Sequence, residues 1–560
     1  MFGENPHINH LINVLLYLIT AVFLFFILKK LLIKYNSLLP FIITLLFIAH
    51  PIHTEVVASL KNREEILSFL GSLASLYFIM KFYNIRNIFN LIIGIIFFIF
   101  AYLSKESAIV FILIIPLTIY FFSEFSIKKI LLIFILLLIT GVTLRIIINT
   151  NLPPVYSPVF FENPLNNSSI WLRLSTGMLV LGFYLKMLIF PHPLLFYYGY
   201  NMIPIEGFGV LSIALLILHL GIFVYAIIGF KKKKLLSYAI FYYLFCISMF
   251  TNIILPINGI VGERFVYSAS LGFAIALAVL LFKISKIKIM DLSYSRKSFG
   301  ILVIAVIIIL IPYSAKTISR NNAWLSHYSL YSNDIEYLKN SAKANELISD
   351  WMFNHLDEFP TNERQDAIAK IEKHYKRSLK VYPDNAQANN NLGTLYLEKQ
   401  KNPDSAIVYF NKCLKADSVY TKAHFNIAQC YTLKKNEKLA RYHYDIFNSL
   451  DTLYFNETSA LSIKYLNNRK FQEAINLNYR LNRIDPSSEV PYYNFANIYI
   501  LMGDTVKGLM FAERYLEINP YNTVFSNTAG EFYKTLGDTE KANFYFDLAE
   551  KYKNASKENE

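Results

Sequence analysis

The sequence predicts an all-α protein in two parts: a polytopic transmembrane helical domain, followed by a solenoid of paired helices. Two observations support this prediction. Hydrophobic residues make up 54% of the 560 residues and the mean hydropathy is +0.36, whereas a soluble protein of this size is closer to about 45–50% apolar. In the C-terminal part, small residues recur at a spacing of 34, which is the length of a helix-turn-helix repeat.

The positive charge is confined to the apolar part. The net charge of the chain is +14. Residues 1–320 carry 25 Lys and Arg against 10 Asp and Glu, a net of +15, and the remainder carries 29 against 30, a net of −1. Lysines in cytoplasmic loops, close to anionic lipid, account for this distribution. The basic balance therefore does not indicate nucleic-acid binding, and we expect no nucleic-acid partner. The three cysteines are too few for a disulfide framework.

The predicted membrane domain covers residues 1–320 and contains about 10 or 11 apolar segments. They lie near residues 11–33, 38–50, 66–80, 88–103, 106–122, 129–149, 174–190, 209–230, 235–256, 268–283 and 299–319. A full span needs about 20 apolar residues, so the shorter segments must include flanking residues or be re-entrant.

Basic clusters predict the topology of an integral, multi-pass membrane protein. Lys29–Lys30, Lys128–Lys129 and Lys231–Lys234 are among the clusters that mark cytoplasmic ends. Working outward from them, we expect the 50–65 loop, residues 104–106, the 150–172 loop and the repeats on the extracytoplasmic face. Between Lys129 and Lys231, which both mark cytoplasmic ends, there are three apolar segments, whereas an even number of spans is required. We therefore expect the segment 174–190, with Arg173 and Lys186, to be re-entrant or interfacial.

The C-terminal part shows the tetratricopeptide period. Five small residues are spaced by 34 each: Ala406, Ala440, Ala474, Gly508 and Ala542. Gly503 and Gly537, and Pro486 and Pro520, repeat at the same spacing. We predict a linker and degenerate first repeat at 321–384, a solenoid of about five repeats at 385–552, and a polar tail at 553–560. Stacked helix pairs leave a concave face, which predicts binding of acceptor or partner proteins.

The first polar cluster joins two apolar segments and runs from His50 to Glu65. His53 and Glu55 lie beside the sequence Asn62-Arg63-Glu64-Glu65. An acid and imidazoles next to an arginine could manage a proton and bind an anionic head group. Two alternatives remain: a metal site of His50, His53 and Glu55, for which the rest of a zinc signature is lacking, and an ordinary polar loop with a helix cap.

Two further charged pairs lie next to apolar segments. Lys105 and Glu106 separate two apolar runs, and the lysine could hold a phosphate as a point charge. Glu263 and Arg264 precede another apolar segment, where they could pair with each other or with the first cluster. Each pair has a structural alternative, a turn for the former and an ion pair for the latter. Ionisable residues near membrane depth are costly, so each is a functional candidate.

The fourth cluster is the loop 150–208. It contains Glu162-Asn163-Pro164, Arg173, and the run Pro191-His192-Pro193-Leu194-Leu195-Phe196-Tyr197-Tyr198. The aromatic side chains could stack on a sugar. Alternatively, they form an aromatic belt at the membrane interface.

An ordered set of motifs resembles one family over nearly the whole chain. The motifs are HLINVLL at 10–16, HPIHTEVVASLKNREEIL at 50–67, LSKESAIV at 103–110, ENP at 162–164, RLSTG at 173–177 and GERFVYSASLGF at 262–273, followed by Trp324 and the repeats. This order resembles the transmembrane and tetratricopeptide-repeat-containing protein O-mannosyltransferases, members of the GT-C superfamily of glycosyltransferases. The resemblance implies a GT-C-like membrane domain.

The resemblance also implies a function. Such enzymes transfer a sugar, expected here to be mannose, from a polyprenyl-phosphate donor to a protein or other acceptor on the extracytoplasmic face. The candidate catalytic residues are Glu55 and His53. The candidates to bind the donor or its lipid phosphate are Arg63, Lys105, Glu106, Glu263, Arg264 and Arg173. No metal ligand is predicted, and the sequence does not decide whether a divalent cation takes part.

The chain departs from the family pattern at two places. In the family, a transmembrane helix and an acidic loop with the catalytic aspartate lie ahead of the position where this sequence begins, so Glu4-Asn5-Pro6-His7 is expected to be only the tail of that loop. The family's Asp-Tyr after the Pro191 run is replaced by Tyr197-Tyr198-Gly199-Tyr200. The alternatives to an enzyme are a catalytically inactive membrane scaffold whose repeats bind proteins, and a transporter. The transporter is disfavoured because the polar clusters gather on one side.

Overall fold

The computed structural model describes residues 6–151, 163–291, 293–450, 452–485 and 487–557, and all regular structure in these ranges is helical. The predicted all-α fold class is therefore confirmed. By its contacts the chain divides into two compact units. One consists of Met1–Phe359 with Lys380–Tyr382, and the other of Pro360–Leu379 with Pro383–Glu560.

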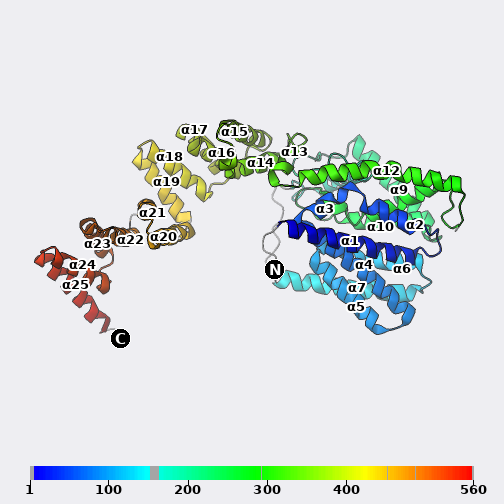
Figure 1. The fold of residues 1–560 in the computed structure, drawn as a ribbon, viewed down its shortest axis with the longest axis horizontal. Coiled ribbons are helices and arrows are strands. Elements are labelled where there is room, and N and C mark those ends of the chain that lie inside the picture. Colours follow the sequence, from blue (N-terminus) through cyan, green and yellow to red (C-terminus); the bar gives the residue numbers. More distant parts are fainter. Residues whose placement is uncertain (1–5, 152–162, 292, 451, 486, 558–560) are drawn as a thin grey trace. The chain divides into compact units, whose positions relative to one another are not determined.

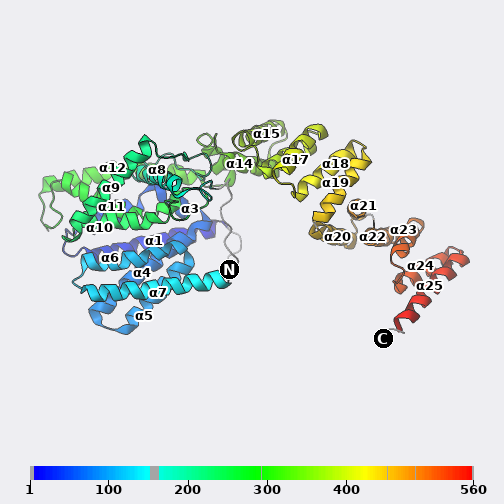
Figure 2. The ribbon, with the colours of Figure 1, turned by 180° about the vertical axis from the view of Figure 1, so that it is seen from behind.

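The first unit is a bundle of long apolar helices (Figures 1 and 2). Its α-helices are α1 (Pro6–Leu31), α2 (Leu39–Ile48), α3 (Thr54–Ala58), α4 (Arg63–Ile85), α5 (Ile88–Ser104), α6 (Phe111–Phe122), α7 (Ile127–Asn151), α8 (Ile170–Ile189), α9 (Val210–Phe230), α10 (Leu235–Ser248), α11 (Ser270–Ile284), α12 (Arg296–Ala323), α13 (His327–Asp334) and α14 (Ala342–Asn354). Short 3₁₀ turns are η1 (Pro51–His53), η2 (Leu60–Asn62), η3 (Glu106–Val110), η4 (Glu263–Val266) and η5 (Leu356–Glu358).

Glycine allows the helices of this bundle to approach closely. Helix α4 packs along α5, with α1 against its other side (Figure 1). A Cβ atom added at Gly94 would lie 2.7 Å from the Ile79 side chain, which is closer than real Cβ contacts allow. Only a residue without a side chain fits there. The outward faces of α7 and α9 expose Ile, Leu and Val residues, and such continuous apolar surface fits a lipid environment.

Several helices are long and apolar enough to cross a membrane. Among the described residues there are six, or seven if the bent pair Leu39–Ile48 and Pro51–Ala58 forms one span. Four shorter apolar helices accompany them: Ile88–Ser104, Glu106–Phe122, Leu235–Ser248 and Ser270–Ile284. The chain is a membrane protein.

Two segments of the bundle differ in helix continuity, while the re-entrant or interfacial position expected for 174–190 stays a prediction. The segment 174–190, expected to be re-entrant or interfacial, belongs to α8, a continuous helix of 20 residues that is long enough to span. The bend of 51° lies between α2 and the turn that starts at Pro51. Proline disfavours helical backbone in the residue before it, and His50 is extended, with φ −68° and ψ 122°.

The second unit is a stack of helix pairs. It begins with α15 (Arg364–Val381), and the pairs follow in chain order: α16 (Ala386–Glu398) with α17 (Pro403–Ala416), α18 (Thr421–Leu433) with α19 (Glu437–Leu450), α20 (Thr452–Asn467) with α21 (Phe471–Ile484), α22 (Val490–Leu501) with α23 (Thr505–Ile518), and α24 (Thr523–Thr535) with α25 (Thr539–Lys557). Figure 1 shows these pairs in sequence.

The repeated small residues lie where paired helices cross. The four alanines of the series are buried, and a Cβ atom at Gly508 would lie 2.6 Å from the Ile500 side chain. Gly503 and Gly537 end the first helix of their pairs with φ of +83° and +82°, a left-handed conformation that glycine adopts without strain. Pro486, one of the two prolines that repeat at this spacing, lies outside the described residues.

Candidate functional site

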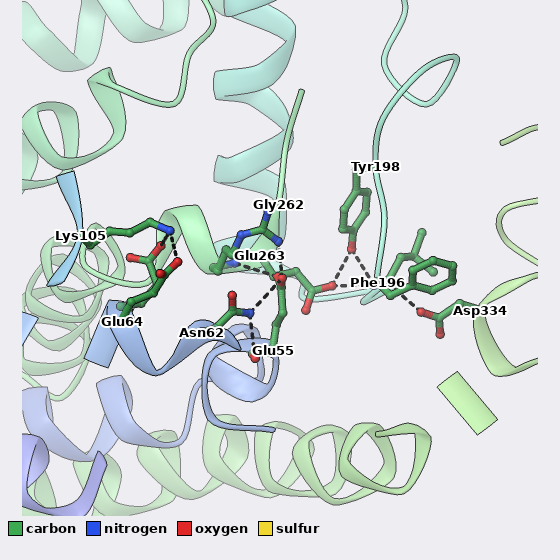
Figure 3. Close-up of polar contacts among 12 residues, drawn as sticks. Glu55, Asn62, Glu64, Lys105, Phe196, Tyr198, Gly262, Glu263 and Asp334 are labelled. Carbon is green, nitrogen blue, oxygen red and sulfur yellow. Dashed lines mark hydrogen bonds and ion pairs between the residues drawn. The ribbon is translucent and has the colours of Figure 1, made fainter. Parts of the chain in front are cut away.

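Four segments bring charged and polar groups together in the first unit. They are α3 with the start of α4, the turn η4, the loop after α8, and α13 (Figure 3). The contacting pair Glu55 and Arg264 is separated by 209 positions in the sequence. The helical bundle therefore assembles this site.

Glu55 and Arg264 form a mostly buried ion pair. Glu55 Oε1 lies 2.6 Å from Nη1 of Arg264 and accepts a weaker hydrogen bond from Asn62 Nδ2 at 3.3 Å. Its other oxygen accepts from the Arg264 backbone N–H at 2.9 Å. The Glu55 side chain is 5% exposed and that of Arg264 is 31% exposed. Both carboxylate oxygens are thus occupied by partners within the protein.

Glu263, next to this pair, has one oxygen without a partner. Its Oε1 accepts hydrogen bonds from the Tyr198 hydroxyl at 2.7 Å and from the Leu195 backbone N–H at 2.5 Å (Figure 3). Its Oε2 is buried and has no hydrogen-bond partner among the described residues. Burial, the largest effect, raises the pKa of the Glu263 carboxyl above its ordinary value, and the charge of Arg320 offsets this only in part.

The loop ahead of Glu263 is held by buried asparagines. Asn163 Nδ2 donates to Asn252 Oδ1 at 2.8 Å and to the Ile257 carbonyl at 2.7 Å. Asn252 in turn donates to the Ile260 carbonyl at 2.7 Å. The motif residue Asn163 therefore has a positioning role, because it fixes the chain that presents Glu263. Glu162 of the same motif lies outside the described residues.

A second buried ion pair ties α12 and α13 to the same loop. Arg320 meets Asp334 through two bonds, of 2.5 and 2.9 Å, and the two side chains are 3% and 1% exposed. Asp334 Oδ2 also accepts from the Phe196 backbone N–H at 2.8 Å. Phe196 follows Leu195, whose backbone N–H donates to Glu263. Two consecutive residues of this loop therefore bind Glu263 and Asp334.

Lys105 and Glu106 form separate contacts. Lys105 pairs with Glu64 and lies 3.5 Å from Glu65 (Figure 3). Glu106 pairs with Arg145 at 2.8 Å, on a half-exposed surface. Lys105 is thus already neutralised by two acids of α4. None of the ion pairs of the described residues joins it to Glu55 or Glu263.

The two histidines of the first cluster are core residues. His53 lies between the Tyr17 and Ser270 hydroxyls, each at 2.8 Å, and His50 Nε2 contacts the Leu188 carbonyl at 2.9 Å. Both side chains are buried. Their ring nitrogens are therefore occupied, and the part of the chain that the structure describes contains no group of three or more His, Cys, Asp or Glu suited to a metal.

The remaining predicted arginines bind polar groups of their own surroundings. Arg63 donates to the Asn13 side chain at 2.7 Å and to the Asn9 carbonyl at 2.9 Å. Arg173 donates to the Leu165 and Asn166 carbonyls at 3.3 and 3.0 Å. Among the described residues, neither Arg63 nor Arg173 forms a hydrogen bond or ion pair with Glu55 or Glu263. Their role in binding a donor stays a prediction.

Sequence reasoning missed Arg320 and Asp334, and it treated Tyr198 only as an aromatic surface. Arg320 closes an apolar helix, which is itself a signal, because an ionisable residue there is costly without a partner. Asp334 offered no comparable signal in a polar stretch. The partnership of the two is visible only once α13 folds back against α12.

The fold and site define a helical membrane protein with a tetratricopeptide unit and a buried acidic site. A family model described as tetratricopeptide repeat matches residues 374–408. The chain is 24% identical to human protein O-mannosyl-transferase TMTC1 over 455 residues, 70% of this chain and 48% of the relative. It is 26% identical to mouse protein O-mannosyl-transferase TMTC3 over 483 residues, 80% of this chain and 49% of the relative.

Two further matches were found. Protein O-mannosyl-transferase F38B6.6 of Caenorhabditis elegans is 28% identical over 317 residues, covering 54% of this chain and 42% of the relative. The solved structure titled "Crystal structure of YrrB: a TPR protein with an unusual peptide-binding site" is 16% identical, with 35% of this chain and 95% of that chain covered and a TM-score of 0.22.

These relatives confirm the resemblance to the transmembrane and tetratricopeptide-repeat-containing protein O-mannosyltransferases. The chain spans about half the length of the curated relatives it matches, since the covered share is 48% for human TMTC1 and 49% for mouse TMTC3.

Proposed function

We propose that this protein is a multi-pass membrane glycosyltransferase that transfers a sugar from a polyprenyl-phosphate donor to a protein acceptor on the extracytoplasmic face. The names of the relatives, protein O-mannosyl-transferases, favour mannose as the sugar. The tetratricopeptide unit would bind the acceptor or a partner protein, because stacked helix pairs offer an extended binding surface.

The observation that carries the proposal is the pair of neighbouring acids Glu263 and Glu55, of which Glu55 holds Arg264 and Glu263 lies within the electrostatic influence of Arg320. Glycosyl transfer to a hydroxyl requires a group that takes the hydroxyl proton. The acceptor oxygen forms a bond to the sugar C1, the bond from C1 to the phosphate oxygen breaks, and the polyprenyl phosphate leaves with the electron pair. A carboxylate with a free oxygen can accept the proton, and cationic groups stabilise the leaving phosphate.

Glu263 is better placed than Glu55 for the proton transfer. Both oxygens of Glu55 are bound by Arg264 and Asn62, whereas Glu263 Oε2 has no partner among the described residues. A carboxyl with a raised pKa also holds a transferred proton more readily. In this assignment Glu55 orients Arg264 and thereby η4, and Glu263 acts as the base.

The second candidate function is a membrane scaffold without catalysis. It is favoured by the Glu55–Arg264 pair, because both oxygens of Glu55 are bound within the protein, as in an ion pair with a structural role. In that case the repeats alone carry the function, by binding proteins.

A transfer assay on the full chain separates the two functions. The protein is placed in lipid vesicles with polyprenyl-phosphate mannose and a set of Ser/Thr-rich acceptor proteins, and mannose incorporation is measured. Glu263→Gln removes the base while preserving the side-chain shape, so we expect at least about a hundredfold loss of kcat. Glu124→Gln, an exposed acid paired with Lys34, is the matched control and should retain full activity. Absence of transfer by the wild-type chain, with protein binding intact, would establish the scaffold instead.

A further inference from the structure

An apolar groove lies in the first unit beside the candidate site. It has a volume of about 790 Å³ and is formed by α11, α12 and the segment that follows α8. Its wall is apolar along Phe273, Leu277, Leu280, Ile308, Ile309 and Pro312. This volume is typical of a small-molecule site, and the lining suits a hydrocarbon chain.

One end of the groove is cationic. Lys316 of α12 lines it, and its Nζ lies 3.2 Å from Nδ1 of His192, which lines it too. The Lys186 ammonium donates to the His192 carbonyl. Neither lysine lies within ion-pair distance of a carboxylate in the described ranges. Lys316 thus presents a positive charge at the end of an apolar groove, and no ion pair among the described residues neutralises it.

The cations that the sequence singled out do not offer the same possibility. Arg264 is held by Glu55 and Lys105 by Glu64 and Glu65. An anion would have to compete with these internal carboxylates. At Lys316 no carboxylate of the described residues lies within ion-pair distance, and a bound anion would offset the repulsion between Lys316 and Arg320.

The cationic end adjoins the candidate base. Lys316 interacts electrostatically with Glu263 and with Asp334. Tyr313, one turn before it on α12, donates to the Leu188 carbonyl at 3.3 Å, and its ring packs 4.7 Å from that of His50. A group held at Lys316 is therefore within electrostatic reach of Glu263 and Asp334, while a chain attached to it would run along the apolar wall.

We propose that this groove binds the isoprenoid chain of a polyprenyl phosphate, with the phosphate on Lys316 and His192. The proposal rests on the proposed function, because the nearness of Glu263 is what selects a sugar-carrying phosphate over a bulk phospholipid. Lys316 and His192 provide N–H donors to the phosphate oxygens, which are charge-assisted hydrogen bonds. Lys186 acts through His192 as a positioning residue.

The test is direct binding to the full chain in detergent micelles or vesicles, read by photo-cross-linking. The probe is a polyprenyl phosphate with a diazirine in its first isoprene units, and the modified peptides are mapped. Cross-links are expected on α11 and α12, within Phe273–Leu280 and Ile308–Lys316. Cross-links confined to other helices would overturn the proposal.

Charge variants measure the contribution of the phosphate contacts. Lys316→Gln and His192→Gln should each weaken competition by unlabelled polyprenyl phosphate about tenfold, which corresponds to ~1.4 kcal/mol. Lys297→Gln is the matched control, since Lys297 is an exposed lysine near the other end of the same helix, and its binding should equal wild type. Equal binding by Lys316→Gln would refute the assignment of the phosphate.

Competitors identify the ligand chemistry. Polyprenyl phosphate should displace the probe, whereas the uncharged polyprenol, inorganic phosphate and dioleoyl phosphatidate should each compete at least about tenfold less well. Equal competition by phosphatidate would make the groove a general phospholipid site. Equal competition by polyprenol would show that the cations contribute nothing. Either result overturns the proposal.

A filled groove gives a second test that does not depend on charge. Ala276→Trp introduces a large ring into the wall of the groove, and cross-linking should be lost. Ala305→Trp on α12, outside the lining residues, is its control. Failure of transfer with normal binding in these assays would refute the glycosyltransferase and leave the lipid site standing. Normal transfer without binding in the groove would refute the lipid site alone.

Discussion

The buried pair Arg320–Asp334 offers the most quantitative prediction, for the variant Asp334→Asn. The substitution keeps the shape of the side chain and an acceptor for the Phe196 N–H, and removes only the negative charge. Arg320, whose side chain is 3% exposed, then loses a partner held through bonds of 2.5 and 2.9 Å. Removing one member of a buried pair costs about 3–5 kcal/mol, because the other charge stays buried. Glu263, which also attracts Arg320, compensates in part, so we expect about 3 kcal/mol.

The measurement is denaturant unfolding of the full chain in micelles, followed by tryptophan fluorescence. Trp324 lies 5.7 Å from the Arg320 guanidinium and Trp351 stacks on Tyr328 at 4.9 Å, so both report on this region. Trp171 is replaced by Phe in all variants to isolate that signal. The free energy of unfolding is obtained by linear extrapolation.

A double variant tests whether the uncompensated charge of Arg320 causes the loss of stability. Adding Arg320→Met to Asp334→Asn removes the uncompensated charge and fills its space with an apolar chain, so the double variant should be more stable than Asp334→Asn alone. The control is Asp291→Asn, whose exposed pair with Lys288 spans 3.9 Å and should contribute less than about 0.5 kcal/mol. A cost below about 1 kcal/mol for Asp334→Asn, or a further loss in the double variant, would show that the pair does not hold α13.

Three more predictions concern the repeats. Phe410→Ala should cost about 3–5 kcal/mol in urea unfolding, because Phe410 is fully buried, while Val408→Ala on the exposed face of the same helix should change stability by less than about 0.5 kcal/mol. Gly393→Ala places a Cβ 2.6 Å from the Phe410 ring. Overpacking costs about 1–3 kcal/mol and outweighs a helix-propensity gain of about 1 kcal/mol, so we expect a net loss of stability in urea unfolding. A stabilised variant would contradict this contact. Burial, and then the charge of His424, lower the pKa of His443 to about 4. Below pH 6.5 the unfolded chain therefore binds a proton that the folded chain does not, and the thermal midpoint should fall as the pH is lowered from 7 to 5. The variant His443→Gln should show a smaller fall. A wild-type midpoint that does not change between pH 7 and 5 would show that the imidazole is accessible in the folded chain.

The helices and the repeat were readable from the sequence because both leave local signals. A run of apolar residues must be buried or face lipid wherever it folds, so α1, α7 and α12 coincide with predicted segments. The 34-residue spacing of Ala406 and Ala440 arises because each crossing of paired helices needs a small residue. The positions where a helix bends or continues were harder to predict from the sequence. Pro51 bends the chain after α2, whereas α8 continues despite Arg173 and Lys186.

The site shows what only the tertiary structure decided. The sequence indicated that Glu55, Glu263 and Arg264 were unusual, because charges beside apolar segments need a reason. It did not determine that Arg264 pairs with Glu55 across 209 positions, or that Glu263 keeps one oxygen without a partner among the described residues. Partner choice depends on which helix ends meet, and a buried charge is stable only beside the partner that packing brings to it. For the same reason the cationic groove at Lys316 exists only in the folded bundle, where α11 and α12 lie together.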